Sequence, residues 1–241
     1  DAMDEITQKF LRDVGPVLCL DIGSGTQDAL LARPGLECEN WPRFVLPSPA
    51  RLAAQRIREL TLSKRPVWLY GGNMGGGFTQ AVREHLAAGL PVASTAAATR
   101  GIHDNEDVVR GMGVTVCSQC PEKSVPVCLS DYAPDFWANL LRLSGLPLPH
   151  LVLGAAQDHG FHAQGNRQGR MCFWQKELAS SPCPTKWIHA VPPVSLTRLV
   201  ALHEKTGGPV ADTGTSVLLG ALCDAAVMER SFREGITVVN V

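Results

Sequence analysis

The sequence has few aromatic residues, no excess of charge of one sign and no long uninterrupted hydrophobic run. Phe, Trp and Tyr make up 6% of its 241 residues, and Lys and Arg number 22 against 23 Asp and Glu. A nearly neutral chain lacks the basic excess that neutralises nucleic-acid phosphates. No apolar run approaches the ~18 residues of a membrane-spanning helix, and the N-terminal stretch has no signal-peptide pattern. We therefore expect a cytoplasmic protein with no nucleic-acid or membrane partner.

Cysteine is present, but its spacing does not fit a disulfide scaffold. The eight cysteines are irregularly spaced, and with no export signal we expect most thiols to stay free in a reducing compartment. Cys117-x2-Cys120 together with Cys128 would bind zinc if a fourth ligand such as His103 came near. The alternative is that these thiols are buried or reactive, and the sequence leaves that choice open.

The order of apolar runs predicts an α/β fold. Three strands are expected first, at Val17–Ile22, Asp28–Ala32 and Phe44–Leu46, and helices and strands alternate after them. Such alternation favours largely parallel sheets flanked by helices. We place a first domain at residues 1–116 and a second at 117–241. Among the later elements are two helices and a strand, expected at Gly169–Ala179, Thr215–Glu229 and Ile236–Val239.

A glycine-containing turn, DIGSGTQD (Asp21–Asp28), follows the first expected strand. Small residues let backbone N–H groups come close to a phosphate, and a threonine hydroxyl adds a donor. A carboxylate at the end of the strand can hold Mg²⁺, as phosphoryl chemistry requires. The alternative is a tight hairpin that uses its glycines only for their conformational freedom. We expect Asp21 to be catalytic and magnesium-binding, and the phosphate to be bound by Gly23, Ser24, Gly25, Thr26 and Gln27.

This segment resembles the first phosphate loop of the actin-like ATPase superfamily, which includes sugar kinases, heat-shock ATPases and actin. Other segments, among them GGNMGGG, GIHDN, AQDHG, ADTG and the terminal TVVNV, are similar to a prokaryotic family labelled "putative pyruvate formate-lyase activating enzyme". The matching segments run from residue 21 to residue 241. The resemblance implies an actin-like fold with a ribonuclease-H-like N-terminal half, and ATP and Mg²⁺ as cofactors.

Actin-like enzymes hold their nucleotide between two domains, each with its own phosphate loop. This sequence ends at Asn240 and Val241, within the expected strand that would lead to the second loop. We therefore expect the chain to be truncated at its C-terminus.

The activating-enzyme label implies radical-SAM chemistry, which needs cysteines at C-x3-C-x2-C spacing to hold a [4Fe–4S] cluster. That spacing does not occur in this sequence. We therefore do not expect the activity that the label names.

A second glycine-rich segment, GGNMGGG (Gly71–Gly77), stands between an expected strand and an expected helix. The first turn of a helix has unpaired N–H groups and a favourable dipole, so we expect Gly75, Gly76 and Gly77 to help bind an anion. The alternative is close packing of the strand against the helix, which leaves no room for a Cβ. The segment matches neither G-x-G-x-x-G nor G-x-x-x-x-G-K-[ST], which argues against a nicotinamide cofactor.

Asp158 and His159 follow the apolar run LVLGAA at the end of another expected strand. Ligands of open α/β sheets gather at that end of the strands. We expect these two side chains to be catalytic, as general base or metal ligand. The alternative is that Asp158 caps the next turn.

The segment ADTG contributes Asp212, Thr213 and Gly214. A single Asp-Thr-Gly followed by a helical pattern does not make an aspartic protease, which needs two such aspartates. Two interpretations stay open: a ligand-binding loop that faces the same cleft as Asp21, or Asp212 as a helix N-cap.

These patterns favour a protein that binds a phosphate-bearing ligand, namely a nucleotide with Mg²⁺. Phosphotransfer from ATP or ATP hydrolysis is then the natural reaction, with Asp158 as the base. Two alternatives come from other classes: a non-catalytic binding module on the same scaffold, and an enzyme that acts on a small anionic metabolite through Asp158 and His159. The substrate and the oligomeric state do not follow from the sequence.

Overall fold

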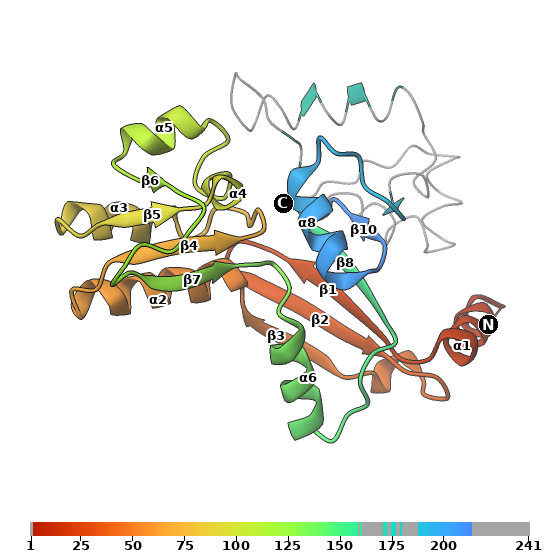
Figure 1. Ribbon diagram of the computed structural model, residues 1–241. Coiled ribbons are helices and arrows are strands. Elements are labelled where there is room, and N and C mark those ends of the chain that lie inside the picture. The colour runs from red at the N-terminus through yellow and green to blue at the C-terminus, as the bar shows by residue number, and fades with distance from the viewer. Residues whose placement is uncertain are drawn as a thin grey trace.

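The computed structural model describes residues 2–158, 160, 171–172, 175–176, 179 and 188–213. Within these residues the chain forms two β-sheets that lie side by side, each covered by helices (Figure 1). Sheet A has the strand order β3-β2-β1-β8-β10-β9, and sheet B has the order β6-β5-β4-β7. The predicted α/β class is confirmed.

Sheet A begins with the three strands that were expected first, and they form an antiparallel meander. β1 pairs antiparallel with β2, and β2 pairs antiparallel with β3. On the other side of β1, β8 is parallel to β1, and β10 is parallel to β8. The strands are β1 (Val17–Ile22), β2 (Thr26–Ala32), β3 (Arg43–Pro47), β8 (Leu151–Ala156), β9 (Ile188–His189) and β10 (Val210–Ala211).

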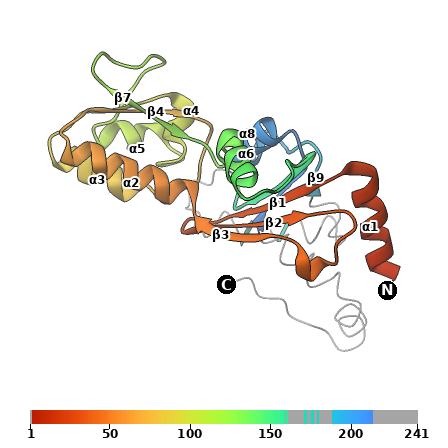
Figure 2. The ribbon, with the colours of Figure 1, turned by 90° about the horizontal axis from the view of Figure 1, so that it is seen from below.

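The two faces of sheet A pack against different helices, because side chains alternate along each strand. Leu18, Leu20 and Ile22 of β1 belong to a buried cluster that includes residues of α6 (Pro134–Leu143) and α8 (Thr197–Thr206). Cys19 lies on the opposite face, where Leu11 of α1 (Ala2–Val14) joins a smaller cluster. Figure 2 shows α6 and α8 together on one side of the sheet and α1 at its end.

Sheet B is entirely parallel, as the alternation of helices and strands predicted. Apolar side chains of its helices and strands form one continuous hydrophobic core on a single face of the sheet. The strands are β4 (Val67–Gly71), β5 (Val92–Ser94), β6 (Thr115–Val116) and β7 (Val125–Leu129). The helices are α2 (Pro49–Leu62), α3 (Thr79–Ala87), α4 (Ala96–Thr99) and α5 (Glu106–Gly111), and a short 3-10 turn, η1 (Cys38–Asn40), precedes β3.

The path of the chain places sheet B between two parts of sheet A. The chain leaves sheet A after β3, forms α2 through β7, and returns through α6 to β8. The sheets therefore do not follow the expected division into residues 1–116 and 117–241, because strands from both segments pair within each sheet. Pairing of β1 with β8 is non-local, and no pattern within a short window of sequence indicates it.

The later predicted elements can be followed only in part. The strand at Ile236–Val239 and the helix at Thr215–Glu229 lie outside the described residues, as does most of the stretch 169–179. Within the part of the chain that the structure describes, none of the helices combines the length and the apolar character needed to cross a membrane.

α3 carries a buried titratable side chain, His85. Its side chain is fully buried, and its Nδ1 lies 2.7 Å from the Thr61 hydroxyl of α2. Burial lowers the pKa of His85 below its ordinary value of 6.5, because the imidazolium would lose its hydration. As the pH drops below the ordinary pKa of 6.5, His85 binds a proton in the unfolded chain but not in the folded chain. The free energy of unfolding therefore falls with the pH in this range.

We expect the free energy of unfolding to decrease between about pH 7.5 and about pH 5.5, and to decrease less in His85→Gln, which keeps a polar group near Thr61 without a titrating ring. Urea unfolding of both proteins at the two pH values measures the difference. Equal decreases in both proteins would show that His85 does not contribute.

Candidate functional site

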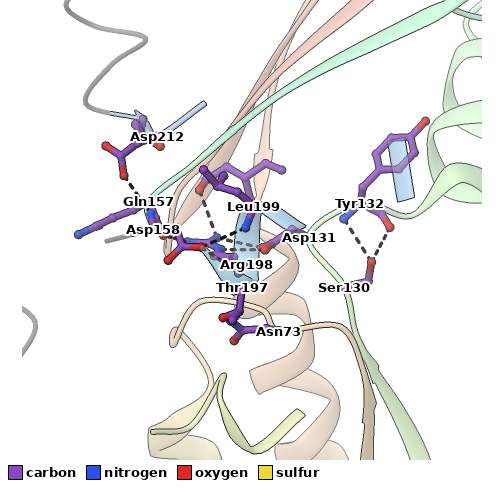
Figure 3. Close-up of polar contacts among 12 residues, drawn as sticks. Asn73, Ser130, Asp131, Tyr132, Gln157, Asp158, Thr197, Arg198, Leu199 and Asp212 are labelled. Carbon is purple, nitrogen blue, oxygen red and sulfur yellow. Dashed lines mark hydrogen bonds and ion pairs between the residues drawn. The ribbon is translucent and has the colours of Figure 1, made fainter. Parts of the chain in front are cut away.

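Four aspartates lie at the carboxyl ends of strands, close to where the two sheets meet. Asp21 is the second-to-last residue of β1. Asp131 follows β7, Asp158 follows β8 and Asp212 follows β10. Near Arg198, at the start of α8, Asp131 pairs with the guanidinium, Asp158 accepts from the backbone N–H, and Asp212 accepts from the N–H of Asp158 (Figure 3). This is the edge at which open α/β sheets bind their ligands.

Asp21 is half-buried and lies on the face of sheet A opposite α6 and α8. Burial raises the pKa of Asp21, because it disfavours the charged carboxylate, and the charges of Asp28 and Asp212 raise it further. A hydrogen bond of 3.2 Å from the Thr213 hydroxyl to Oδ1 of Asp21 acts in the opposite direction. A cation beside this carboxylate would offset the effects of burial and of the neighbouring negative charges.

Asp21 and Asp28 also line a hollow of about 540 Å³ on this face of sheet A. Its other walls are mainly apolar and include Cys19, Leu30 and Leu153. A hollow of this size suits a small organic molecule, for which apolar walls and a few charged groups are typical.

The first glycine turn closes tightly and stays exposed. The N–H of Gly23 donates to the carbonyl of Thr26 over 2.9 Å, and residues 23–26 are all exposed. Ser48, the N-cap of α2, donates from its hydroxyl to the Ser24 carbonyl at 2.7 Å and from its N–H to the Gly25 carbonyl at 3.0 Å. The turn is therefore fixed to the start of sheet B's first helix.

Gln27, the last residue of the predicted phosphate turn, points away from the exposed side. Its side chain is 3% exposed, and its Nε2 donates to the carbonyl of Pro47 at 3.0 Å. This contact joins β2 to β3. Gln27 thus supports the turn from within the fold and does not present its amide on the exposed side.

The second glycine turn lies against the first. A Cβ added to Gly77 would be 2.8 Å from the carbonyl oxygen of Ser24 and 2.9 Å from the Cβ of Ala50. Gly76 is exposed, and a Cβ there would make only ordinary contacts, the nearest at 3.4 Å. The structure therefore brings together two segments that the sequence analysis proposed separately, and it gives a reason for glycine at position 77.

Asp158 is buried and receives three backbone hydrogen bonds. Its Oδ2 accepts from the N–H groups of Arg198 and Leu199, at 2.8 and 3.1 Å, and its Oδ1 accepts from Gly160 at 3.0 Å. Asp158 thus caps the first turn of α8, where N–H groups lack partners within the helix. The bond from Gly160, two residues along the chain, matches the capping of the next turn that the sequence left open as an alternative; the bonds to α8 were not predicted.

Asp212 and Thr213 connect this cap to Asp21. Oδ2 of the buried Asp212 accepts a hydrogen bond of 2.9 Å from the N–H of Asp158, and Thr213 donates to Asp21. The segment after β10 thus lies beside the carboxyl ends of β1 and β8. The predicted site residues His159 and Gly214 lie outside the described residues.

Arg198 is at the centre of the cluster and is 8% exposed. Its guanidinium forms a two-pronged ion pair with Asp131, with Nε and Nη2 at 2.7 and 2.9 Å from the carboxylate oxygens. Burial disfavours its positive charge, but the neighbouring carboxylates, Asp131 first, outweigh burial and raise the pKa of Arg198. Arg198 therefore carries its positive charge, as arginines in proteins do.

The cysteines proposed as zinc ligands show no such assembly. Within the described residues, no three side chains among His, Cys, Asp and Glu gather closely enough to hold a metal ion. Cys117 and Cys120 direct their thiols at nearby backbone carbonyls, and Nδ1 of His103 accepts from the N–H of Asn105. Cys117, Cys120 and Cys128 are free thiols and none of them is buried, so the buried form of the alternative is wrong.

A protein-family model described as "Putative pyruvate format-lyase activating enzyme (DUF1786)" matches residues 74–241, more than half of the chain. The chain belongs to this family. The DUF1786 match begins inside the second glycine turn and includes Asp131, Asp158, Arg198 and Asp212. A search of curated proteins finds no match to the chain.

Sequence reasoning missed Asp131 and Arg198 of this DUF1786 protein. Asp131 had a usable signal, because it stands two residues after the apolar strand β7, as Asp158 stands two residues after β8. Arg198 had none, since an arginine beside Leu199 and Leu202 in an amphipathic helix is normally solvated. Only the arrangement of the folded chain shows that Arg198 is buried.

Proposed function

We propose that this protein binds a phosphate-bearing ligand, specifically a nucleotide with Mg²⁺, at the two glycine turns. The observation that carries the proposal is the close approach of Gly77 to Ser24, which places two exposed glycine turns together. Asp21 stands at the end of the strand that leads into the first turn. Small residues and a nearby carboxylate are what a phosphate with its magnesium ion requires.

Each part of the site has a definite task in this proposal. The N–H groups of Ser24 and Gly25 and the hydroxyl of Thr26 would bind phosphate oxygens, and the exposed backbone of Gly76 would approach them from the other side. Asp21 would hold Mg²⁺, which favours one or two carboxylates together with phosphate oxygens. The apolar hollow beside Asp21 offers room for the nucleoside.

The strand order of sheet A supports the actin-like assignment within this proposal. Three antiparallel strands are followed in space by strands parallel to the first, and the glycine turn joins β1 to β2. The resemblance implies the same meander with its phosphate loop after the first strand. We accordingly propose a ribonuclease-H-like core in sheet A with sheet B inserted into it.

One observation favours binding without hydrolysis as the second candidate. A general base needs a carboxylate oxygen that can accept a proton from the attacking water. Asp158 is buried, and its two oxygens accept three backbone N–H groups, which leaves little of the carboxylate accessible to water. If Asp158 is the only base available, the site would hold a nucleotide without hydrolysing it.

Thermal unfolding with ATP and Mg²⁺, with ADP and Mg²⁺, and with ATP and EDTA tests the proposal. A ligand at about a hundred times its Kd adds about 2.7 kcal/mol to native-state stability. For a chain of this size each kcal/mol raises the Tm by about 2–4 °C. We expect such a rise with ATP and Mg²⁺, and its loss with EDTA. No rise under any condition would reject nucleotide binding.

Asp21→Asn should abolish the ligand-dependent rise without lowering the Tm of the free protein. Because its pKa is raised in the native state, the stability linked to Asp21 is present at low pH and is lost as the pH rises through that pKa. At neutral pH the ionised carboxylate is therefore unfavourable, and the free variant should melt at the same temperature as the wild type or higher. Asp104→Asn, at an exposed position distant in sequence, is the matched control.

A further inference from the structure

We propose that Arg198 is a positioning residue that fixes the two glycine turns relative to each other, so that one anion can contact both. This inference rests on the proposed function, because it assigns the turns to a single ligand. The role does not require Arg198 to touch the ligand. The positioning role follows from the contacts that the Arg198 side chain makes with sheet A on one side and with the second glycine turn on the other.

On the side of sheet A, Arg198 binds the carboxyl ends of two neighbouring strands. Nη1 donates to the carbonyl of Gln157 at 3.0 Å, and Nη2 donates to the carbonyl of Ile22 at 3.4 Å. Ile22 is the residue before the first glycine turn, and Gln157 follows β8. The guanidinium thus fixes the point at which the first turn leaves β1.

On the side of sheet B, the same group packs against the second glycine turn. A Cβ added to Gly75 would be 2.5 Å from Nη1 and 2.7 Å from Cζ of Arg198, so the guanidinium occupies the space beside Gly75. The preceding residue of α8, Thr197, is hydrogen-bonded through its hydroxyl to the side chain of Asn73 in the same turn. The first turn of α8 therefore contacts the second glycine turn through two consecutive residues.

Asp131 completes the arrangement from the segment that leads out of sheet B. It lies just after β7, where the chain crosses back toward sheet A, and pairs with Nε and Nη2 of Arg198. A flat guanidinium with five N–H donors can serve the Asp131 carboxylate and the two strand carbonyls at once. The compact ammonium of lysine cannot reproduce this geometry, which explains why position 198 requires arginine for this role.

Hydrogen exchange in Arg198→Lys tests the role without any ligand. We expect exchange of the backbone N–H groups in residues 22–27 and 71–77 to become faster by a factor of at least about ten. Exchange in the body of α2 should stay unchanged. The control is Arg58→Lys, the same substitution in the exposed ion pair of Arg58 with Glu84, which should leave both turns at the wild-type rate.

Affinity for ATP and Mg²⁺ supplies the functional readout. Arg198→Lys should bind at least tenfold more weakly than wild type, while Arg58→Lys binds normally. If Arg198→Lys does not fold, the double variant Arg198→Gln with Asp131→Asn removes both charges and leaves no unpaired ion, and the same exchange pattern is expected from it.

Two outcomes would overturn the positioning role: wild-type exchange in both turns of the folded variant, or a uniform increase over the whole chain. The second would mean that Arg198 contributes only general stability. If wild type itself binds no ATP with Mg²⁺, the proposed function fails, yet the exchange measurement still decides whether Arg198 fixes the turns.

Discussion

Asp131→Ala is expected to lower the free energy of unfolding by about 3–5 kcal/mol, the largest effect that a single substitution in this site should have. Removing the carboxylate leaves the guanidinium of Arg198, 8% exposed, without its ion-pair partner. Breaking a buried ion pair from one side is much more damaging than removing both charges, because the remaining charge has neither water nor a counterion. Urea unfolding monitored by circular dichroism measures the loss.

The matched control is Glu84→Ala, which removes the carboxylate of the exposed pair with Arg58. Water can solvate the arginine that remains there, so little change is expected. A second comparison uses Asp131→Ala combined with Arg198→Met, which should recover a large part of the lost stability. If Asp131→Ala unfolds at the urea concentration of the wild type, the pair does not hold the two sheets at this point.

Gly77→Ala is the second substitution with a large expected effect. The added methyl would lie 2.8 Å from the backbone carbonyl of Ser24 and 2.9 Å from the Cβ of Ala50. Neither neighbour is a flexible side-chain end, so the two glycine turns must move apart. We expect a destabilisation of about 1–3 kcal/mol, the usual effect of overpacking, and a loss of the ATP-dependent rise in Tm.

Gly76→Ala in the same turn is the control for this prediction. A methyl there would meet the Gly101 carbonyl at 3.4 Å and the Thr79 hydroxyl at 3.5 Å, both ordinary contact distances. Its stability should stay close to that of the wild type. Calorimetry of the two variants with and without ATP and Mg²⁺ gives both readouts. Equal behaviour of Gly76→Ala and Gly77→Ala would contradict a specific contact between the turns.

Most local elements could be predicted from the sequence, because each carries its own signal. β1 was predicted with the bounds that the structure shows, Val17–Ile22, and β3 was predicted one residue shorter at each end. A local pattern does not indicate which strands pair with each other. Sheet B lies between β3 and β8 in the chain, so the pairing of β1 with β8 could not be inferred from either segment alone.

Several residues of the candidate site could be named from the sequence, but their arrangement could not. Asp21 and the two glycine turns could be named, since glycines and a carboxylate at strand ends have a recognisable chemistry. Their juxtaposition could not be, because the contact between Gly77 and Ser24 depends on how the two sheets are placed. Arg198 shows the same limit: its side chain is buried among Asp131, Gln157 and Ile22, which come from three distant segments of the chain.

A crystal structure of this protein with Mg²⁺ and a non-hydrolysable ATP analogue tests the central claim most directly. Our account predicts phosphate oxygens within hydrogen-bond distance of the backbone at Ser24 and Gly25, with Mg²⁺ at the carboxylate of Asp21 and the exposed face of Gly76 toward the ligand. The nucleoside would extend over the hollow beside Asp28. Nucleotide bound away from both glycine turns, or Mg²⁺ bound without any contact from Asp21, would contradict it.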